Sequence, residues 1–440
     1  MLAPTADAAS RDCGDVPASP FSNGYRIYVM LVLGLIYVVS SVDRMMVSIV
    51  ADPVKHEFGL SDTALGVLTG LFFAVSFSVC GIPIGILVDR LKRTRLLAGL
   101  VLVWSALTFT TGFAGSYAML ALARVGVGAS EAGVAPTSMS LITDFFPPRQ
   151  RGRAMSFFYV STPIGVSLGL VMGGFLADRY GWRGAFLVAG LPGIALALLL
   201  LTTVKEPVRG YFERSRPRET AARVSAASVL DAYRRIPALW LLAVGGMFLI
   251  IGQSGTNAFA TPFLMRVHGL SIRDAGYALG VAHFVPGVIG ALGGGVLADR
   301  LARRSVSLGP LVIGLIQIVN FPVAACAYLV GDWHVAIALL ALHNCLLATY
   351  YGSFFSTYLS LSPVALRGTL ASILAVAMTL MGYGFGPVVA GAASDFFQRW
   401  GTVDPLRLSQ ATVAAMFLLS GLFLLAAGRA IGRMAPIADR

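Results

Sequence analysis

Long apolar runs alternate with short polar segments along almost the whole chain. A helix that spans a bilayer needs about 20 consecutive apolar residues, and the chain holds twelve runs of this kind. They cover residues 26–50, 62–88, 94–112, 117–144, 152–179, 184–204, 237–264, 272–299, 305–329, 333–361, 367–397 and 406–430. The pattern therefore predicts an all-α membrane protein with twelve transmembrane helices.

Composition supports a membrane protein and excludes a nucleic-acid-binding one. Of the 440 residues, 57% are hydrophobic and 12% are charged, whereas soluble domains carry about a quarter charged residues. The net charge of +12 is spread over short loops, without a basic face. Most Lys and Arg residues lie in loops on the side of the N-terminus, so we expect both termini in the cytoplasm. The preference for Arg over Lys suggests a bacterial source and hence the cell inner membrane.

A polar segment at residues 205–236 divides the chain into halves of similar length. We expect it to be a cytoplasmic linker with an amphipathic helix near residues 221–235. Polar tails are expected at residues 1–25 and 431–440, so the two bundles would cover residues 26–204 and 237–430. Each bundle would hold six helices.

The halves repeat each other about 210 residues apart. GILVDRLKRTR (Gly85–Arg95) recurs as GVLADRLARRS (Gly295–Ser305), and each copy lies between the second and third run of its half. PPRQRGRAMS is echoed by SPVALRGTLAS, and the glycine-rich tract at 163–181 is loosely matched at 382–398. Three matches in register indicate duplicated six-helix bundles.

Four ionisable residues interrupt the apolar runs of the first half: Asp43, Arg44, Arg124 and Glu131. Such groups at membrane depth are costly unless they are paired or hydrated. Arg124 and Glu131 are seven residues apart, so they share a helix face. They could form a structural ion pair or a titratable coupling site. We expect Asp43 to face a cavity near both, and Arg44 to pair with Asp43 or Glu131 or to extend toward the interface.

Two copies of the loop motif G-x-L-x-D-R-x-x-R-[KR] resemble those of the major facilitator superfamily. That resemblance covers nearly the whole chain and implies two six-helix bundles around a central cavity, lined by the first and fourth helices of each half. Asp43–Arg44 and the residues Arg124, Gly128, Glu131 and Ala132 resemble the Spinster-like branch. This narrower resemblance implies proton-linked movement of lysophospholipids or sphingolipids.

The duplicated loop also predicts a conformational latch between the halves. A carboxylate at the end of its helix can meet the positive N-terminus of a helix in the other half, and such contacts would exist only when the cytoplasmic side is closed. The alternative is a solvated loop that merely follows the positive-inside rule. The expected latch residues are Gly85, Asp89, Arg90, Arg93, Asp299 and Arg300.

The second half offers neutral polar and aromatic residues where the family places its cavity. On that basis the expected substrate wall comprises Gln253, Asn257, Phe259, Asn344 and Tyr351. His283 and His343 could titrate near neutrality, or they could be satisfied neutral groups. In the first half, Gly165, Gly169 and Gly173 form a stripe that we expect to contact the other half.

These observations lead to two transport hypotheses. The first is a proton-coupled secondary transporter of a lysolipid-like amphiphile; the second is a symporter of a small organic anion held by Arg44 and Arg124. Sodium could replace the proton in either. An enzyme is not expected, because the sequence holds no nucleophile–base pair, phosphate loop or metal spacing. We expect no cofactor, a monomer in the lipid bilayer, and protons and an amphipathic or anionic small molecule as ligands.

Overall fold

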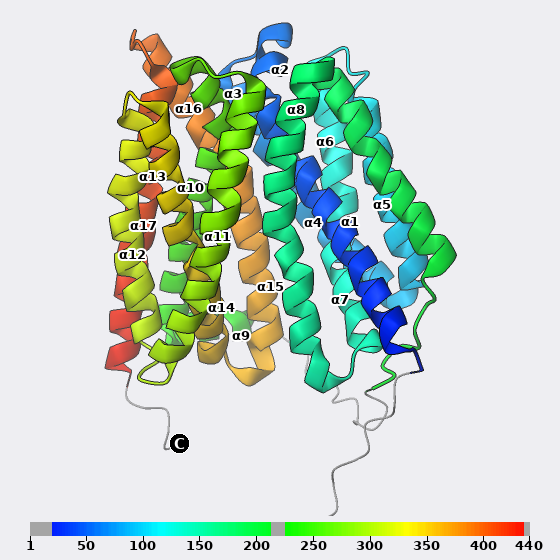
Figure 1. Cartoon of the computed structure of the whole chain (residues 1–440). Coiled ribbons are helices and arrows are strands. Elements are labelled where there is room, and N and C mark those ends of the chain that lie inside the picture. Colours follow the sequence, from blue (N-terminus) through cyan, green and yellow to red (C-terminus); the bar gives the residue numbers. More distant parts are fainter. Residues whose placement is uncertain (1–19, 213–224, 435–440) are drawn as a thin grey trace, which may run out of the picture.

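The computed structural model describes residues 20–212 and 225–434, which form helices with no strand among them. The helices pack as two groups placed side by side, as Figure 1 shows. The first half contains α1 (Asn23–Ile49), α2 (Ala51–Phe58), α3 (Asp62–Gly66), η1 (Val67–Leu71), α4 (Phe72–Arg90), α5 (Arg93–Thr111), α6 (Tyr117–Glu131), α7 (Val134–Phe145) and α8 (Pro148–Thr203).

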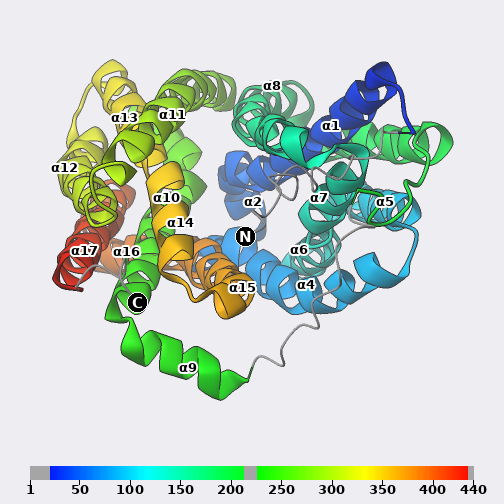
Figure 2. The same cartoon turned by 90° about the horizontal axis from the view of Figure 1, so that it is seen from below.

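The second half has the same plan. It contains α10 (Pro237–His268), α11 (Ile272–Ala302), α12 (Leu308–Leu329), α13 (Trp333–Ala348), α14 (Tyr350–Leu361), η2 (Val364–Leu366), α15 (Arg367–Ala377), η3 (Met378–Gly384), α16 (Phe385–Arg399) and α17 (Pro405–Arg433). The short helix α9 (Ala226–Arg235) lies outside the bundle beside the start of α10, as Figure 2 shows. It confirms the described part of the expected amphipathic helix, whereas residues 221–224 and most of the expected tails lie outside the described residues.

Within the described ranges, eleven helical segments are long and apolar enough to cross a membrane, and one of them is α8. Its 56 residues would measure roughly 84 Å if straight, far more than the hydrocarbon thickness of about 30 Å. The chain reverses within α8 at Gly181, whose φ of 71° is readily available only to glycine. This segment therefore makes two crossings, and the chain makes the twelve that the apolar pattern predicts.

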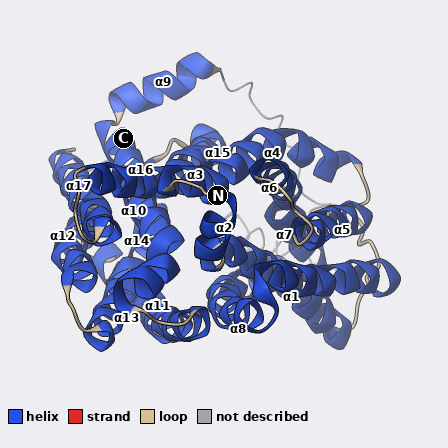
Figure 3. Cartoon of the chain, turned by 90° about the horizontal axis from the view of Figure 1, so that it is seen from above, coloured by secondary structure: helices blue, strands red, loops and turns tan. Residues whose placement is uncertain are grey.

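The two ends of the described chain lie at one end of the molecule, at the bottom of Figure 1. We call this end the terminal end. The opposite end, which carries α2 and the bend at Gly181, is called the far end. Figure 3 views the molecule from the far end and shows α8 beside α11, and α3 beside α16. These two pairs join the halves.

The glycine stripe of α8 packs differently from the expectation. A Cβ added to Gly165, Gly169 or Gly173 would lie 2.6–2.9 Å from side chains of α1. The stripe therefore seats α8 against α1 within the first half. The neighbouring Gly174 turns the other way, and its Cβ would lie 2.8 Å from the carbonyl oxygen of Ile272 in the second half. A one-residue shift moves a side chain by about 100° around a helix, which explains the different partner.

Candidate functional site

A cluster of charged side chains lies inside the first half, where α1, α5 and α6 meet. Asp43, Arg124 and Glu131 are each no more than 5% exposed. The fourth helix breaks directly after Glu131, because α6 ends there and α7 begins at Val134. Pro136 lies in the first turn of α7, where its missing N–H is tolerated. The break places the Glu131 carboxylate at a helix end in the protein interior.

Arg44, rather than Arg124, pairs with Glu131. The Nη1 atom of Arg44 is 3.4 Å from Oε2 of Glu131, and Ser40 donates a hydrogen bond of 3.1 Å to the same oxygen. Of the alternatives that the sequence leaves open for Arg44, the structure shows the pair with Glu131. The other carboxylate oxygen, Oε1, is buried and has no hydrogen-bond partner among the described residues.

Asp43 does not face the space between the halves, contrary to the expectation. It points toward α5 and accepts a hydrogen bond of 2.6 Å from the Thr108 hydroxyl. The side chains of Asp43 and Arg44 diverge because consecutive helical residues are about 100° apart. Asp43 thus belongs to the interior of the first bundle, and its Oδ2 atom has no hydrogen-bond partner among the described residues.

Arg124 lies between the two carboxylates without forming an ion pair to either in the described structure. Its guanidinium is 5.1 Å from the ring centroid of Phe73, and it interacts electrostatically with Asp43 and Glu131. Of the two alternatives for Arg124 and Glu131, the structural ion pair between them is therefore not formed. The cluster contains two acids and two arginines, and only Arg44–Glu131 is in contact.

Arg44 also reaches the space between the halves. Its side chain is 26% exposed, and its guanidinium lies 5.8 Å from the ring centroid of Tyr37 on α1. Electrostatic interactions link it to Tyr383 on η3 of the second half, and link Tyr383 to Tyr351 on α14. Tyr351 and Tyr383 are 43% and 46% exposed. A single arginine is thus shared between a buried carboxylate and a tyrosine-lined space.

The remaining residues of the expected substrate wall divide into two groups. Asn257 and Asn344 line a cavity together with His283 and His343. Phe259 does not: it is 1% exposed and packs in the hydrophobic core at the far end. Gln253 is half-buried on α10, and its Oε1 atom has no hydrogen-bond partner among the described residues.

The halves are joined at the far end by ion pairs centred on Asp62, which is 1% exposed. Lys55 contacts its carboxylate at 2.7 Å, Ser394 of α16 donates to it at 2.7 Å, and Arg266 of α10 lies at 2.9 Å. Arg266 also pairs with Asp52. The side chains of the second half thus neutralise acids of the first.

Asp395 on α16 caps a helix of the opposite half. Its carboxylate accepts hydrogen bonds from the backbone N–H of Asp62 at 3.0 Å and from that of Thr63 at 2.9 Å, at the start of α3. A carboxylate at a helix N-terminus satisfies otherwise unpaired N–H groups and interacts favourably with the helix dipole. Together with the Asp62 ion pairs, this contact closes the far end.

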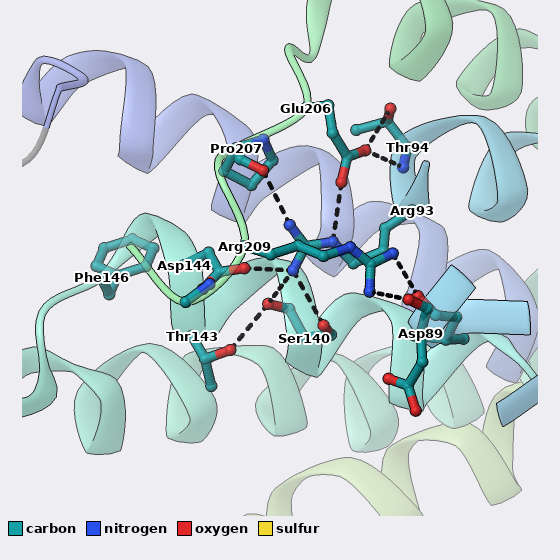
Figure 4. Close-up of polar contacts among 12 residues, drawn as sticks. Asp89, Arg93, Thr94, Ser140, Thr143, Asp144, Phe146, Glu206, Pro207 and Arg209 are labelled. Carbon is teal, nitrogen blue, oxygen red and sulfur yellow. Dashed lines mark hydrogen bonds and ion pairs between the residues drawn. The ribbon is translucent and has the colours of Figure 1, made fainter. Parts of the chain in front are cut away.

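At the terminal end, the expected latch residues are mostly exposed. Asp89, Arg90, Asp299 and Arg300 are all exposed, and a Cβ added to Gly85 would meet nothing within 4 Å. Figure 4 shows the Asp89 side chain pointing away from the neighbouring Arg93 cluster. In this conformation the duplicated loops make no contact between the halves among the described residues.

Arg93 differs from the other expected latch residues, because it is 1% exposed. Its guanidinium pairs with Asp144 of α7 and contacts Glu206 of the linker at 2.9 Å, as Figure 4 shows. Burial opposes ionisation of Glu206, but hydrogen bonds from Thr94 and Arg93 outweigh it and lower the pKa of Glu206. Arg93 therefore fastens the linker to the first half instead of reaching the second.

The sequence-based interpretation missed the far-end residues, although the repeat contains a signal for them. FGLSDTALG at 58–66 matches HGLSIRDAG at 268–276, and Asp395 follows Gly391 by four residues as Asp178 follows Gly174. A Cβ on Gly391 would lie 2.1 Å from the carbonyl oxygen of Asp62. The glycine marks close contact between the halves, and the aspartate one turn later reaches the helix that it contacts.

Two duplicated bundles, joined at one end and holding buried charges beside a space between them, define a membrane transporter rather than an enzyme. The model of the Major Facilitator Superfamily matches residues 33–387. The chain therefore belongs to the Major Facilitator Superfamily.

Three comparisons refine this assignment. An "MFS-type efflux pump" of Mycolicibacterium smegmatis is 30% identical over 83% of each chain. The "Probable L-galactonate transporter" of Escherichia coli is 29% identical over 63% of this chain and 62% of its own. The crystal structure of a bacterial homologue of the human lysosomal transporter Spinster, inward-facing and unoccupied, has a TM-score of 0.84 and 27% identity, covering 94% of this chain and all of the other. The protein is related to Spinster and to sugar acid transporters.

Proposed function

We propose that the protein is a proton-coupled secondary transporter of an amphipathic anion of the lysophospholipid or sphingolipid type. The observation that carries this proposal is the position of Arg44, which pairs with Glu131 and is also exposed to the space between the halves. An anionic group that enters this space competes with Glu131 for Arg44. A carboxylate that loses its cationic partner in a buried site binds a proton more readily.

This competition couples the two ligands. Protonation of Glu131 frees Arg44 for the substrate anion, and binding of the anion favours protonation of Glu131. The reciprocity follows from linkage between two sites that share one residue. Asp43 and Arg124 set the charge balance around Glu131, because both interact with it electrostatically. The two acids and two arginines balance when both acids are ionised, so protonation of Glu131 leaves one net positive charge for the substrate anion to balance.

The tyrosines around Arg44 suit an amphipathic substrate. Aromatic rings present an apolar face together with a polar hydroxyl, so Tyr37, Tyr351 and Tyr383 can contact both a polar headgroup and the start of an acyl chain. Arg44 would hold a phosphate or carboxylate through its fork of N–H donors. The structural similarity to a Spinster homologue agrees with the Spinster-like resemblance of the sequence, and that resemblance implies this substrate class.

The second candidate is a small organic anion such as a sugar acid. The similarity to a sugar acid transporter favours it, and the same arginine would hold the carboxylate. Both candidates share alternating access. We assign the terminal end to the cytoplasm of a bacterial inner membrane, so the structure with its closed far end would be inward-facing. We expect a monomer to suffice, since each chain contains a complete set of these residues.

A transport assay in proteoliposomes tests the proposal. Lysophosphatidylethanolamine and galactonate are each supplied with and without an imposed pH gradient. We expect uptake or release of the lysolipid to follow the gradient, and Arg44→Gln to abolish it whereas Arg44→Lys retains part of it. Gradient-dependent transport of galactonate alone would favour the second candidate. If both compounds were transported at rates that do not depend on the pH gradient, proton coupling would be disproved.

A further inference from the structure

A small cavity, lined mainly by the second half, contains several polar side chains that the proposed transport mechanism does not use. It is lined by Asn257, His283, Tyr328, His343 and Asn344 of the second half and by Met45 and Leu170 of the first. Met45 follows Arg44 in α1 and its side chain points about 100° away from that of Arg44, so the cavity lies on the adjoining face of the helix that carries the anion-binding arginine. It lies between the halves, because residues of both line it.

The hydrogen bonds of His343 define which of its nitrogen atoms is left without a partner among the described residues. Its Nδ1 atom is 2.8 Å from Oδ1 of Asn320, and Asn320 in turn donates to Gln317 at 3.1 Å. An amide oxygen only accepts, so Nδ1 carries the proton. In the neutral ring the remaining Nε2 is then an acceptor. It has no hydrogen-bond partner among the described residues.

His283 has the opposite arrangement. The Nδ2 atom of Asn344 donates to the carbonyl oxygen of Ala282 at 3.4 Å and lies 3.2 Å from Nδ1 of His283. Because the carbonyl only accepts, the amide nitrogen faces both groups, and Nδ1 of His283 accepts its second hydrogen. The neutral ring therefore carries its proton on Nε2, which is a donor.

The cavity thus offers one acceptor, Nε2 of His343, and one donor, Nε2 of His283. The two rings interact electrostatically with each other. A hydroxyl group is both a donor and an acceptor, so it can satisfy the two rings together. Leu279 and Leu340 surround these polar groups with apolar side chains. A buried polar pair in such surroundings discriminates strongly against a ligand that leaves it unpaired.

We infer that His283 and His343 form a subsite for a hydroxyl group adjacent to the anionic group of the substrate. This inference rests on the proposed function and adds the recognition of a second chemical group. Lysophospholipids, phosphorylated sphingoid bases and sugar acids all carry such a hydroxyl. The subsite therefore excludes simple fatty acids and other unhydroxylated anions from efficient transport.

Matched pairs of ligands test the inference on the wild-type protein. Lysophosphatidic acid is compared with its 2-deoxy analogue, and galactonate with hexanoate, by transport into proteoliposomes and by thermal stabilisation in detergent. We expect the hydroxylated member of the transported pair to be favoured by roughly tenfold. Whichever pair is transported shows whether the substrate is a lysolipid or a sugar acid. Equal transport of both members of that pair would overturn the subsite.

Two histidine variants separate a recognition role from a structural one. His343→Asn keeps an atom near Nδ1 for the bond to Asn320 and removes the acceptor at Nε2, so the hydroxyl preference should disappear. His343→Gln places its amide near the Nε2 position and should retain most of it. If both His343→Asn and His283→Asn kept the preference for the hydroxylated ligand, the inference would be overturned. The proposal of anion transport would not be affected. If the wild-type protein transported no member of either ligand pair, the proposed function would be disproved, and the subsite with it.

Discussion

The first half of the molecule holds a cluster of four ionisable side chains, three of them buried, whereas every buried polar residue in the described part of α10–α17 is neutral. Duplication gave both halves the same helices, so the helical scaffold alone does not require charges. A buried acid or arginine at membrane depth costs several kcal/mol. This free-energy cost is confined to the half that contains Arg44, which indicates that the charged residues there serve coupling. The amides and imidazoles of the other half would then serve recognition.

The far end shows a second asymmetry between related surfaces. The contact of α3 with α16 carries Asp62, Ser394 and Asp395, whereas the contact of α11 with α8 relies on Gly174 and Gly276. A Cβ on Gly276 would lie 2.5 Å from the carbonyl oxygen of Leu170. Both contacts are closely packed, since a Cβ on Gly391 would also meet the carbonyl oxygen of Asp62, but the first contact adds ion pairs and hydrogen bonds to carboxylates.

The largest expected effect comes from removing the charge of Glu131. Glu131→Gln keeps the shape of the side chain but cannot exchange a proton, so Arg44 loses its titratable partner. We expect transport driven by a pH gradient to fall by about 100-fold, the upper range of a coupling energy between two sites. Counterflow without a pH gradient should fall much less.

A buried residue of the second half is the control for this experiment. Gln410 is fully buried in α17, and its amide atoms have no hydrogen-bond partner among the described residues. Gln410→Met should leave the pH dependence unchanged, because no charge is altered. If Glu131→Gln retained gradient-driven transport while Gln410→Met lost it, coupling would belong to the second half.

The next effect concerns closure of the far end. Asp395→Asn removes the carboxylate that caps α3, and Asp62→Asn removes the partner of Lys55 and Arg266. Breaking a buried ion pair costs about 3 kcal/mol, so Asp62→Asn should shift the population strongly toward a far end that is open. Asp395→Asn should act in the same direction but less. Distances between spin labels on α2 and α16 measure the shift.

Asp178→Asn is the matched control for Asp395→Asn. Asp178 occupies the related position in α8, but it is exposed and forms no hydrogen bond or ion pair within the described residues. Its substitution should leave the distances unchanged. Equal responses to Asp178→Asn and Asp395→Asn would show that the charged contact does not distinguish the two surfaces.

The sequence predicted the scaffold well because membrane helices can be recognised from the length and hydropathy of their apolar runs. All twelve runs correspond to crossings, and the repeats correctly indicated two bundles. Side-chain direction was harder to predict. Asp43 and Arg44 are adjacent, and the local sequence does not determine which of the two side chains faces the other half. The answer depends on how α1 is rotated, which the contact with Gly165, Gly169 and Gly173 of α8 determines.

A smaller effect is expected from loosening the linker at the terminal end. Glu206→Gln removes the charge that contacts Arg93 and Thr94. Hydrogen bonds to a charged group contribute about 2 kcal/mol, so the free energy of unfolding should fall by about that amount. Thermal unfolding in detergent measures it, and Lys205→Gln, at an exposed neighbouring position, serves as the control.

The same contact predicts a dependence on pH. The pKa of Glu206 is lowered from 4.5 in the folded protein, so the folded state binds fewer protons than the unfolded one near that pH. The stabilisation is complete above the unfolded pKa and is lost as the pH falls through the folded pKa, below 4.5. Wild type and Glu206→Gln should converge in stability there. A difference that persists unchanged at lower pH would contradict the role of the charge.

The smallest effect compares the two copies of the latch motif. Asp89 and Asp299 are both exposed while the far end is closed, so neither substitution should alter this conformation. When the terminal end closes, a carboxylate that meets a helix N-terminus contributes up to about 1 kcal/mol. Asp89→Asn should therefore shift the population toward the inward-facing state by up to fivefold, as read from spin-label distances across the terminal end. Asp299→Asn should shift it in the same direction if both copies latch. Unchanged distances in both variants would mean that the duplicated loops serve orientation in the membrane, and that the contacts at the far end alone set the balance between the two states.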